Sequence, residues 1–472
     1  MFRSRLAPSI VLACALGAHV PFANAQDTAS SEASASEAWT GSATLPGGAE
    51  LGFTITLKRG ESPSATIDIP TQGAIGIPLE VISLEGDSVL LRIPAPANAE
   101  IAGTINDQGE LAGMLKQAGM EFPFKMSRSS GAPELARPQH PEPPFPYTVE
   151  AVTFDNEPAG VTLAGTLTLP EGDGPFPAAV LISGSGPQDR DETLVGHKPF
   201  LVLADHLTRA GVAVLRYDER GVGESSGDFS TALTDDFADD ALAGVAFLKD
   251  DPRIMTDRVG LIGHSEGGLV APMAAVSDTS VAYIVLLAGV GLEGGEILVT
   301  QQVAMTRVGG SDEIARTVGQ HMRAMVEAMR SGDDPGMATA LRAVLRAQMI
   351  GATDQQVDDT LAQQIKVFGS PWMRRYVEIN PADFLAGVSQ PTLAMFGSLD
   401  LQVLPTINAE AVRAALASAP TDDVTIVTLP GLNHLFQTAQ TGSPSEYTTI
   451  EETFNETALE LVSSWITQRF VD

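Results

Sequence analysis

The stretch VGLIGHSEGGLVAPMAA, residues 259–275, decides the fold class of this chain. Its first four residues form a compact apolar run that predicts a buried strand, and the small and apolar residues from Gly268 onward predict a helix. Between them lies the pattern G-x-S-x-G, centred on Ser265. A serine on a tight turn between a buried strand and a helix presents its hydroxyl at the end of a sheet, where it can act as a nucleophile. We therefore predict that Ser265 occupies such a turn.

The same pattern occurs a second time, as GESSG at residues 223–227, centred on Ser225. The residues before it, DERG at 218–221, form a polar turn and not a buried strand. Because the nucleophile turn requires the strand, this context favours Ser265 and indicates that Ser225 is an ordinary loop serine.

A serine nucleophile needs a base, and in this arrangement the chain order is serine, acid, histidine. Two of the seven histidines follow Ser265. His321 lies in a methionine-rich helical pattern and is typical of a helix face. His434 follows the apolar run 424–429 and a turn, at the carboxyl end of a predicted strand, where an open parallel sheet places its site. We therefore predict that His434 is the base.

The acid is expected after the preceding predicted strand, 392–396. The loop that follows this strand carries Asp400, whereas Asp383 lies before the strand and is a poor competitor. These assignments predict the chemistry: Ser265 attacks an acyl carbonyl, His434 transfers the proton, and Asp400 orients the imidazole.

The oxyanion formed in such an attack needs preorganised backbone donors. One is expected to be the N–H of Glu266, at the start of the helix. The other is expected from the loop SGSGP at 183–187, where we favour the N–H of Ser185, with Gly186 as the alternative. In the same loop, the charged residues of the run DRD at 189–191 are expected to form an internal ion network. The Glu266 carboxylate has two interpretations, a favourable charge at the helix start or an anchor for a substrate amine.

Around these residues, compact apolar runs alternate with amphipathic helical patterns, which predicts a mostly parallel sheet with helices on both faces. The segment 296–368 interrupts the alternation because it is helix-like throughout, and we expect an inserted helical cap over about 292–388 that shapes a substrate pocket. The predicted strands are 178–182, 212–217, 259–262, 282–288, 392–396 and 424–429, and the predicted helices are 199–209, 237–249, 269–276 and 409–416.

Upstream, short period-two runs separated by turn signals predict a small all-β domain at 36–130, either an antiparallel barrel or a sandwich. Six prolines between positions 133 and 146 predict a stiff linker at 131–147. The catalytic domain is therefore expected at 148–472.

The first residues have the features of a secretory signal peptide: a basic start, an apolar run at 8–20 and the small-residue pattern ANA at 23–25. We expect residues 1–25 to be removed and the protein to be periplasmic or secreted. The run VLAC ending at Cys14 offers lipid anchoring as the alternative.

The chain has 472 residues, with 28 Lys and Arg against 59 Asp and Glu, and a formal net charge of −31. Nucleic-acid binding rests on basic surfaces, so we expect no nucleic-acid partner. After the leader, no run reaches the roughly 18 apolar residues of a membrane span, so we expect none.

The sequence contains five distinctive blocks: SGSGPQDRDE (183–192), RYDERGVG (216–223), GHSEGG (263–268), GSLDLQV (397–403) and LNHLFQ (432–437). Together they resemble the EstD-type esterases of the α/β-hydrolase superfamily, over residues 144 to about 466. The resemblance implies an α/β-hydrolase fold and a serine carboxylesterase acting on short acyl esters without a cofactor; we also expect no metal site. Ser183 departs from the pattern, because many superfamily members have histidine before the oxyanion glycine.

The main prediction is thus an exported serine hydrolase that cleaves a small-molecule carboxylic ester. One alternative is an aminopeptidase or related amidase on the same triad, with Glu266 anchoring an amino terminus. The other is a binding protein whose all-β domain captures a polymer or envelope ligand beside a vestigial hydrolase, and the intact five blocks argue against it. The oligomeric state stays open.

Overall fold

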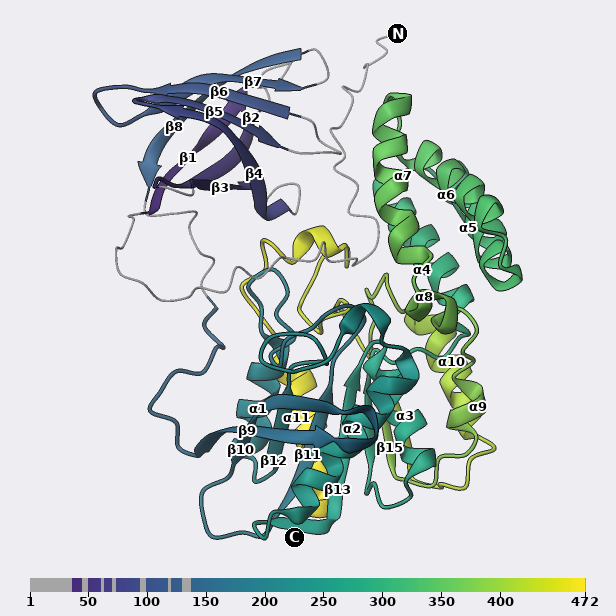
Figure 1. Ribbon diagram of the computed structural model, residues 1–472. Coiled ribbons are helices and arrows are strands. Elements are labelled where there is room, and N and C mark those ends of the chain that lie inside the picture. Colours follow the sequence, from purple (N-terminus) through teal and green to yellow (C-terminus); the bar gives the residue numbers. More distant parts are fainter. Residues whose placement is uncertain are drawn as a thin grey trace.

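The computed structural model describes residues 36–44, 50–60, 63–69, 74–93, 99–117, 120–129 and 137–471 of the protein. The predicted signal peptide, residues 1–25, and the first part of the predicted linker, residues 131–136, lie outside the described residues. The described chain forms a closed sheet, an open sheet and a group of helices inserted between two strands of the open sheet (Figure 1).

The first eight strands close into an antiparallel barrel. They are β1 (Ser36–Thr44), β2 (Glu50–Lys58), β3 (Ser64–Ile69), β4 (Ala74–Glu85), β5 (Ser88–Ile93), β6 (Ala99–Ile105), β7 (Leu111–Gln117) and β8 (Met120–Ser129). Each strand pairs with the next, and β8 returns to pair with β1. Alternate residues are buried, as in β3 and β5, and apolar side chains such as Trp39 and Phe122 fill the interior. The all-β prediction is confirmed, as a barrel.

The remaining eight strands form the open sheet, in the order β16-β15-β14-β13-β11-β12-β10-β9. They are β9 (Thr148–Asn156), β10 (Val161–Leu169), β11 (Phe176–Ile182), β12 (Ala213–Tyr217), β13 (Ile254–His264), β14 (Ile284–Leu287), β15 (Thr392–Gly397) and β16 (Val424–Leu429). Neighbouring strands from β12 through β16 are parallel, whereas β10 pairs antiparallel with both β9 and β12. The prediction of a mostly parallel sheet is confirmed.

Every predicted strand of this sheet is present, and the burial of the strands explains why. All residues of β12, β14 and β15 are buried, because helices cover both faces of the sheet. β9 and β10 were not predicted from the sequence. Exposed residues interrupt β9 along its length, so it has no compact apolar run.

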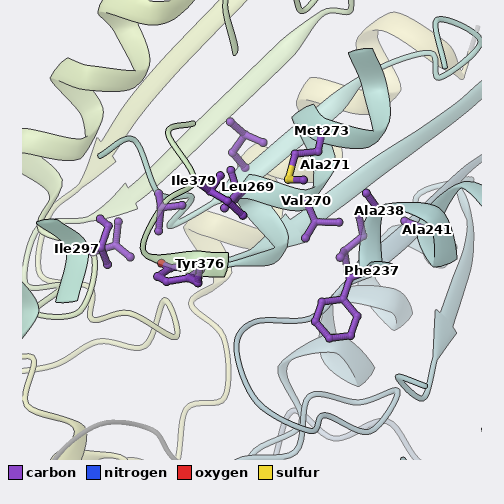
Figure 2. Close-up of a cluster of buried hydrophobic side chains, with 14 of the residues drawn as sticks. Phe237, Ala238, Ala241, Leu269, Val270, Ala271, Met273, Ile297, Tyr376 and Ile379 are labelled. Atoms are coloured by element: carbon purple, nitrogen blue, oxygen red, sulfur yellow. The ribbon is translucent and has the colours of Figure 1, made fainter. Parts of the chain in front are cut away.

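Five helices cover the two faces of the open sheet: α1 (Pro199–Arg209), α2 (Thr234–Asp250), α3 (Gly267–Ser277), α10 (Pro405–Leu416) and α11 (Glu456–Phe470). Buried side chains of α1 and α11 belong to one apolar cluster, and those of α2, α3 and α10 belong to another. Figure 2 shows part of the second cluster, in which Phe237 of α2, Val270 of α3 and Tyr376 of the inserted helices are buried. The helical insertion therefore shares its apolar core with one face of the sheet.

The insertion lies between β14 and β15 and appears in green in Figure 1. Its helices are α4 (Gly294–Gly309), α5 (Asp312–Ser331), α6 (Asp334–Gln348), α7 (Asp354–Phe368), α8 (Pro371–Tyr376) and α9 (Ala382–Leu385). The segment predicted to be helix-like throughout is therefore helical. Within the described ranges, no helix combines the length and the apolar composition that a membrane span requires.

Arg137 and Gln139, in the segment before β9, bind the loop before α11, and Arg137 also binds the loop after β11. Arg137 donates to the carbonyl oxygens of Val195, at 3.0 Å, and of Ile450, at 2.6 Å. The amide oxygen of Gln139 accepts the N–H groups of Thr453 and Phe454, at 2.6 and 3.0 Å. Part of the predicted linker is therefore attached to the loop that precedes α11.

We predict that Gln139→Ala lowers the free energy of unfolding by about 1–3 kcal/mol, because the two backbone N–H groups lose their acceptor. Thermal or urea unfolding measures the change. Gln108→Ala, at an exposed turn of the barrel, is the matched control and should leave stability unchanged within error. Equal stability of the two variants would contradict the attachment of this segment.

Candidate active site

Ser265 lies on the turn between β13 and α3, with φ of +54°. Gly263 and Gly267 flank this turn, and because they have no side chains the backbone segments around the turn can pack closely. A Cβ added to Gly263 would lie 1.9 Å from the carbonyl oxygen of Gly267, and one added to Gly267 would lie 2.2 Å from that of Ile182. The predicted strand–turn–helix unit is present, with the strained serine conformation that such a turn imposes.

His434 and Asp400 lie on the loops that follow β16 and β15. The Nδ1 atom of His434 is 2.8 Å from Oδ2 of Asp400, and both residues are buried. The other carboxylate oxygen of Asp400 accepts the N–H groups of Gln402 and Val403, at 2.7 and 2.9 Å. The carboxylate is thus fixed in place and orients the imidazole ring. The poor competitor Asp383 lies exposed on α9, and His321 lies on α5.

The histidine loop is held by Asn433, which the sequence analysis did not single out. The Asn433 side-chain oxygen accepts the N–H groups of Leu435 and Gln437, at 3.0 and 2.9 Å. Its amide group donates to the side chain of Gln437 at 2.9 Å. An asparagine that folds the backbone around its own side chain is a recognisable turn signal, so this role was accessible from the sequence.

The loop after β11, residues 183–192, lies against the Ser265 turn. A Cβ added to Gly184 would lie 3.2 Å from the Cβ of Ser265. The N–H of Gly184 itself donates to the Glu192 carboxylate at 2.8 Å. The N–H groups of the candidate oxyanion donors are different from the N–H of Gly184. Within the described chain, the N–H groups of Glu266, Ser185 and Gly186 have no hydrogen-bond acceptor in the protein. These three groups stay the candidates.

The Glu266 carboxylate is bonded within the protein. It is 3% exposed, and its Oε1 accepts the hydroxyl of Thr234 at 2.7 Å and the indole N–H of Trp372 at 2.9 Å. Burial raises the pKa of Glu266, and hydrogen bonds from Trp372, Thr234 and the Ser185 side chain oppose the rise. The carboxylate thus links α2, α8 and the loop 183–192, which carries the candidate oxyanion donors and is called the oxyanion loop below. These bonds favour a structural role over an amine anchor.

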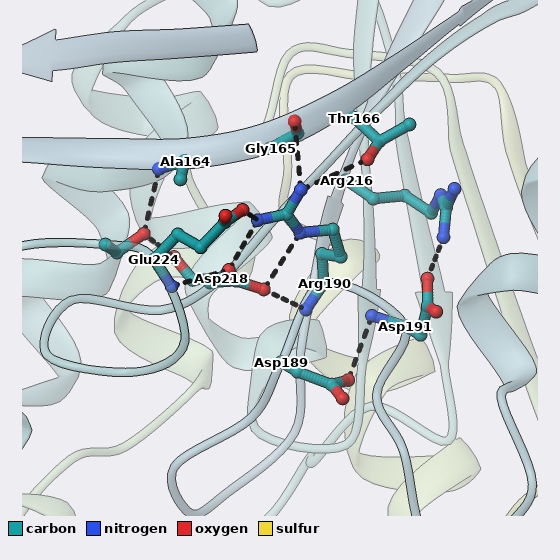
Figure 3. Close-up of polar contacts among 10 residues, drawn as sticks. Ala164, Gly165, Thr166, Asp189, Arg190, Asp191, Arg216, Asp218 and Glu224 are labelled. Atoms are coloured by element: carbon teal, nitrogen blue, oxygen red, sulfur yellow. Dashed lines mark hydrogen bonds and ion pairs between the residues drawn. The ribbon is translucent and has the colours of Figure 1, made fainter. Parts of the chain in front are cut away.

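Ion pairs hold the outer part of this loop (Figure 3). Arg190 binds Asp218 through two nitrogens, at 2.6 and 3.0 Å, and also binds Glu224 at 2.7 Å. Burial alone would raise the pKa of Asp218, but the hydrogen bonds from the Arg190 side chain and from the backbone N–H groups of Glu224 and Arg190, together with the Arg190 charge, outweigh burial and lower the pKa. Asp191 pairs with Arg216. The predicted ion network is confirmed for Arg190 and Asp191, whereas the Asp189 carboxylate accepts the backbone N–H groups of Asp191 and Thr193.

Ser225 is part of the same framework. Its hydroxyl donates to the carbonyl oxygen of Asp218 at 2.6 Å and accepts the N–H of Ala164 at 2.9 Å. These contacts are structural, so the interpretation of Ser225 as a loop serine is confirmed. In the described part of the chain, no three His, Cys, Asp or Glu side chains converge as metal ligands would.

Known proteins resemble parts of this chain. Esterase EstD of Thermotoga maritima is 38% identical over 132 residues, which are 28% of this chain and 32% of that protein. An uncharacterized 31.7 kDa protein of Escherichia coli, from the traX-finO intergenic region, is 29% identical over 143 residues, 30% of this chain and 46% of that protein. The chain therefore spans less than half the length of either relative. The match to EstD confirms the resemblance to EstD-type esterases over part of the chain.

Solved structures are also similar. The α/β hydrolase GrgF from Penicillium sp. sh18 matches with a TM-score of 0.44 and 17% identity, covering 70% of this chain and 100% of that chain. The Pyrococcus furiosus esterase Pf2001 matches with a TM-score of 0.43 and 17% identity, covering 69% of this chain and 92% of that chain. A family model described as "Serine aminopeptidase, S33" matches residues 198–438. Because that model covers just over half of the chain, the protein belongs to the Serine aminopeptidase, S33 family.

Proposed function

We propose that the protein is a serine carboxylesterase that works through Ser265, His434 and Asp400. The observation that carries the proposal is the 2.8 Å contact between His434 and Asp400 at the carboxyl ends of neighbouring strands, together with the strained turn at Ser265. Asp400 holds the imidazole with its Nδ1 hydrogen toward the carboxylate, which leaves Nε2 to accept the serine proton. Ser265 then attacks the acyl carbonyl, the ester C–O bond breaks as His434 returns the proton to the departing alcohol, and water hydrolyses the resulting acyl-enzyme.

The oxyanion of the tetrahedral intermediate is bound by the N–H of Glu266 and the N–H of Ser185, with Gly186 as the alternative to Ser185. Their lack of protein acceptors in the described chain supports this assignment. A backbone donor of this kind is worth about 10²- to 10³-fold in kcat.

An ester is proposed as the substrate because the relative from Thermotoga maritima is named an esterase. The substrate class in this proposal is a small-molecule ester with a short acyl chain. Rates for a series of esters of graded acyl length measure the preference, and faster turnover of long chains would contradict it.

The helical insertion serves as the cap of this site. Three contacts support the cap: Trp372 of α8 donates to Glu266, Arg375 binds Asp235 of α2 at 2.7 Å, and Gln301 of α4 donates to Gln402 at 3.3 Å. Helices attached so close to Ser265 and Asp400 are suited to shape the substrate pocket. A Trp372→Phe variant with an unchanged acyl-length preference would argue against this role.

Export is part of the proposal, with residues 1–25 as the removed leader. The protein found outside the cytoplasm is expected to begin at Gln26, as measured by mass spectrometry of the amino-terminal peptide. A mature chain that begins at a lipid-modified Cys14 would support anchoring instead.

We predict that a fluorophosphonate probe labels the protein at Ser265, because an activated serine attacks the phosphorus centre. Ser265→Ala should abolish labelling, and Ser225→Ala, the control in the second G-x-S-x-G pattern, should retain it. Labelling that persists in Ser265→Ala would exclude this nucleophile. An unlabelled wild-type protein would favour the binding-protein alternative.

The second candidate function is an aminopeptidase on the same triad, because the family model carries that description. Glu266→Gln distinguishes the two. We expect it to change turnover equally for neutral esters and for aminoacyl substrates, because the carboxylate is already bonded to Thr234 and Trp372. A selective rise in KM for aminoacyl substrates, corresponding to about 1.5–3 kcal/mol, would favour the aminopeptidase. Glu171→Gln, at an exposed position, controls for the loss of one negative charge.

A further inference from the structure

His264, the residue directly before Ser265, is buried and touches two loops. Its ring faces the ring of His434, with 4.7 Å between the centroids. Its Nδ1 lies 2.8 Å from Oε1 of Glu192 in the oxyanion loop, and its Nε2 lies 3.0 Å from the backbone carbonyl oxygen of His434. The ring therefore bridges the loop after β11 and the loop after β16.

Both atoms that face the ring nitrogens are oxygens that accept hydrogen bonds. A backbone carbonyl has no hydrogen to give, so Nε2 of His264 must carry one. A carboxylate also only accepts, so Nδ1 carries a hydrogen as well unless Glu192 is itself protonated. Oε1 of Glu192 also accepts the N–H of Gly184 at 2.8 Å, and this second donor favours the charged carboxylate. The geometry favours an imidazolium beside a carboxylate.

The surrounding charges favour the same state. Burial alone would lower the pKa of His264, but the Glu192 carboxylate, the His434 carbonyl and the charge of Asp400 outweigh burial and raise it. Glu219 is buried after β12 near Glu192, but burial raises the pKa of Glu219 well above its ordinary range, so Glu219 is not one of these charges. The ring of His434 is the other titratable group that faces His264.

Glu192 is held in a strained position. Its φ is +52°, in the left-handed region that residues with side chains disfavour. It is 4% exposed, and within the described residues its Oε2 has no hydrogen-bond partner. Such strain persists only where the surroundings fix the residue. The contacts of Oε1 with His264 and Gly184 supply that fixation.

We infer that His264 carries a hydrogen on both ring nitrogens and, paired with Glu192, positions the oxyanion loop and the His434 loop relative to Ser265. The catalytic consequence rests on the proposed function, whereas the protonation state rests on the contacts of the ring. Because the pKa is raised, the stabilisation is complete below the ordinary histidine pKa and is lost as the pH rises through the raised value. Loss of one hydrogen then leaves two acceptors facing each other, and the loops lose their alignment.

Nitrogen NMR of the full chain labelled with ¹⁵N-histidine tests the protonation state. His264→Gln identifies the His264 signals among those of the seven histidines. We expect both ring nitrogens to carry hydrogen at neutral pH, and we expect Glu192→Gln to lower the pH of deprotonation by about 1–3 units. A His264 ring with an unprotonated Nδ1 at neutral pH would overturn the inference, whether or not the protein is an esterase.

The pH dependence of kcat and KM on a neutral ester tests the positioning role. In the wild type, kcat should fall on the alkaline side, and Glu192→Gln should move that fall to lower pH by the same interval. His264→Gln should lower kcat by about 10- to 100-fold with little change in KM. His206→Gln, on α1 and outside the cap, is the matched control and should change neither constant. An alkaline fall that stays in place in Glu192→Gln would overturn the positioning role.

Two further measurements keep these outcomes separable. Fluorophosphonate labelling of wild-type Ser265 tests the proposed function alone. If the protein is not labelled but His264 carries hydrogen on both ring nitrogens, the proposed function is wrong and the inferred protonation state is right. Circular dichroism reports folding of each variant. If His264→Gln does not fold, Glu192→Gln carries the test, because glutamine keeps the shape of the side chain and an oxygen for the N–H of Gly184.

Discussion

The close approach of two backbone segments at Gly267 is the constraint on which the site depends. An added Cβ there would lie 2.2 Å from the carbonyl oxygen of Ile182, the last residue of β11. Because the oxyanion loop begins at the next residue, this contact brings the loop to the Ser265 turn. A side chain at Gly267 would push β11 and α3 apart and would separate the loop from the serine. The glycines around Ser265 therefore determine how closely the ends of β11 and β13 approach each other, as well as the conformation of the Ser265 turn.

Polar contacts fix the loops around Ser265. The buried carboxylates Glu192, Glu219 and Glu266 each accept hydrogen bonds from groups of this region. Burial raises the pKa of Glu219 and of Glu266. A buried polar or charged group without hydrogen-bond partners is unfavourable, so each acid favours the loop arrangement in which its bonds are made. Apolar contacts would tolerate small shifts, whereas a polar network specifies one arrangement. This explains why a loop rich in glycine can still hold a defined shape.

Local patterns predicted the parts of the structure that depend on local burial and chain order. β12 and β15 were predictable because every residue is buried, and Asp400 was predictable because it follows β15. His434 follows β16, which was recognised as a short apolar run although most of its residues are only half-buried. β9 was missed because exposed residues interrupt it. The pairing of Glu192 with His264 and the binding of Gln139 to Thr453 join residues 72 and 314 positions apart. No local pattern marks a contact at such a separation, so these parts of the site and the fold needed the structure.

The helical insertion is attached to the site by side chains that end beside the predicted catalytic groups. Trp372 donates to Glu266, the residue after Ser265, and Gln301 donates to Gln402, near Asp400. If α8 moved away, the buried carboxylate of Glu266 would lose a donor, and a buried acceptor without its donor is unfavourable by about 1–3 kcal/mol. The position of α8 and the electrostatics at the start of α3 are therefore coupled. A substrate that displaces α8 would act on the Ser265 turn through Glu266, because that carboxylate belongs to both.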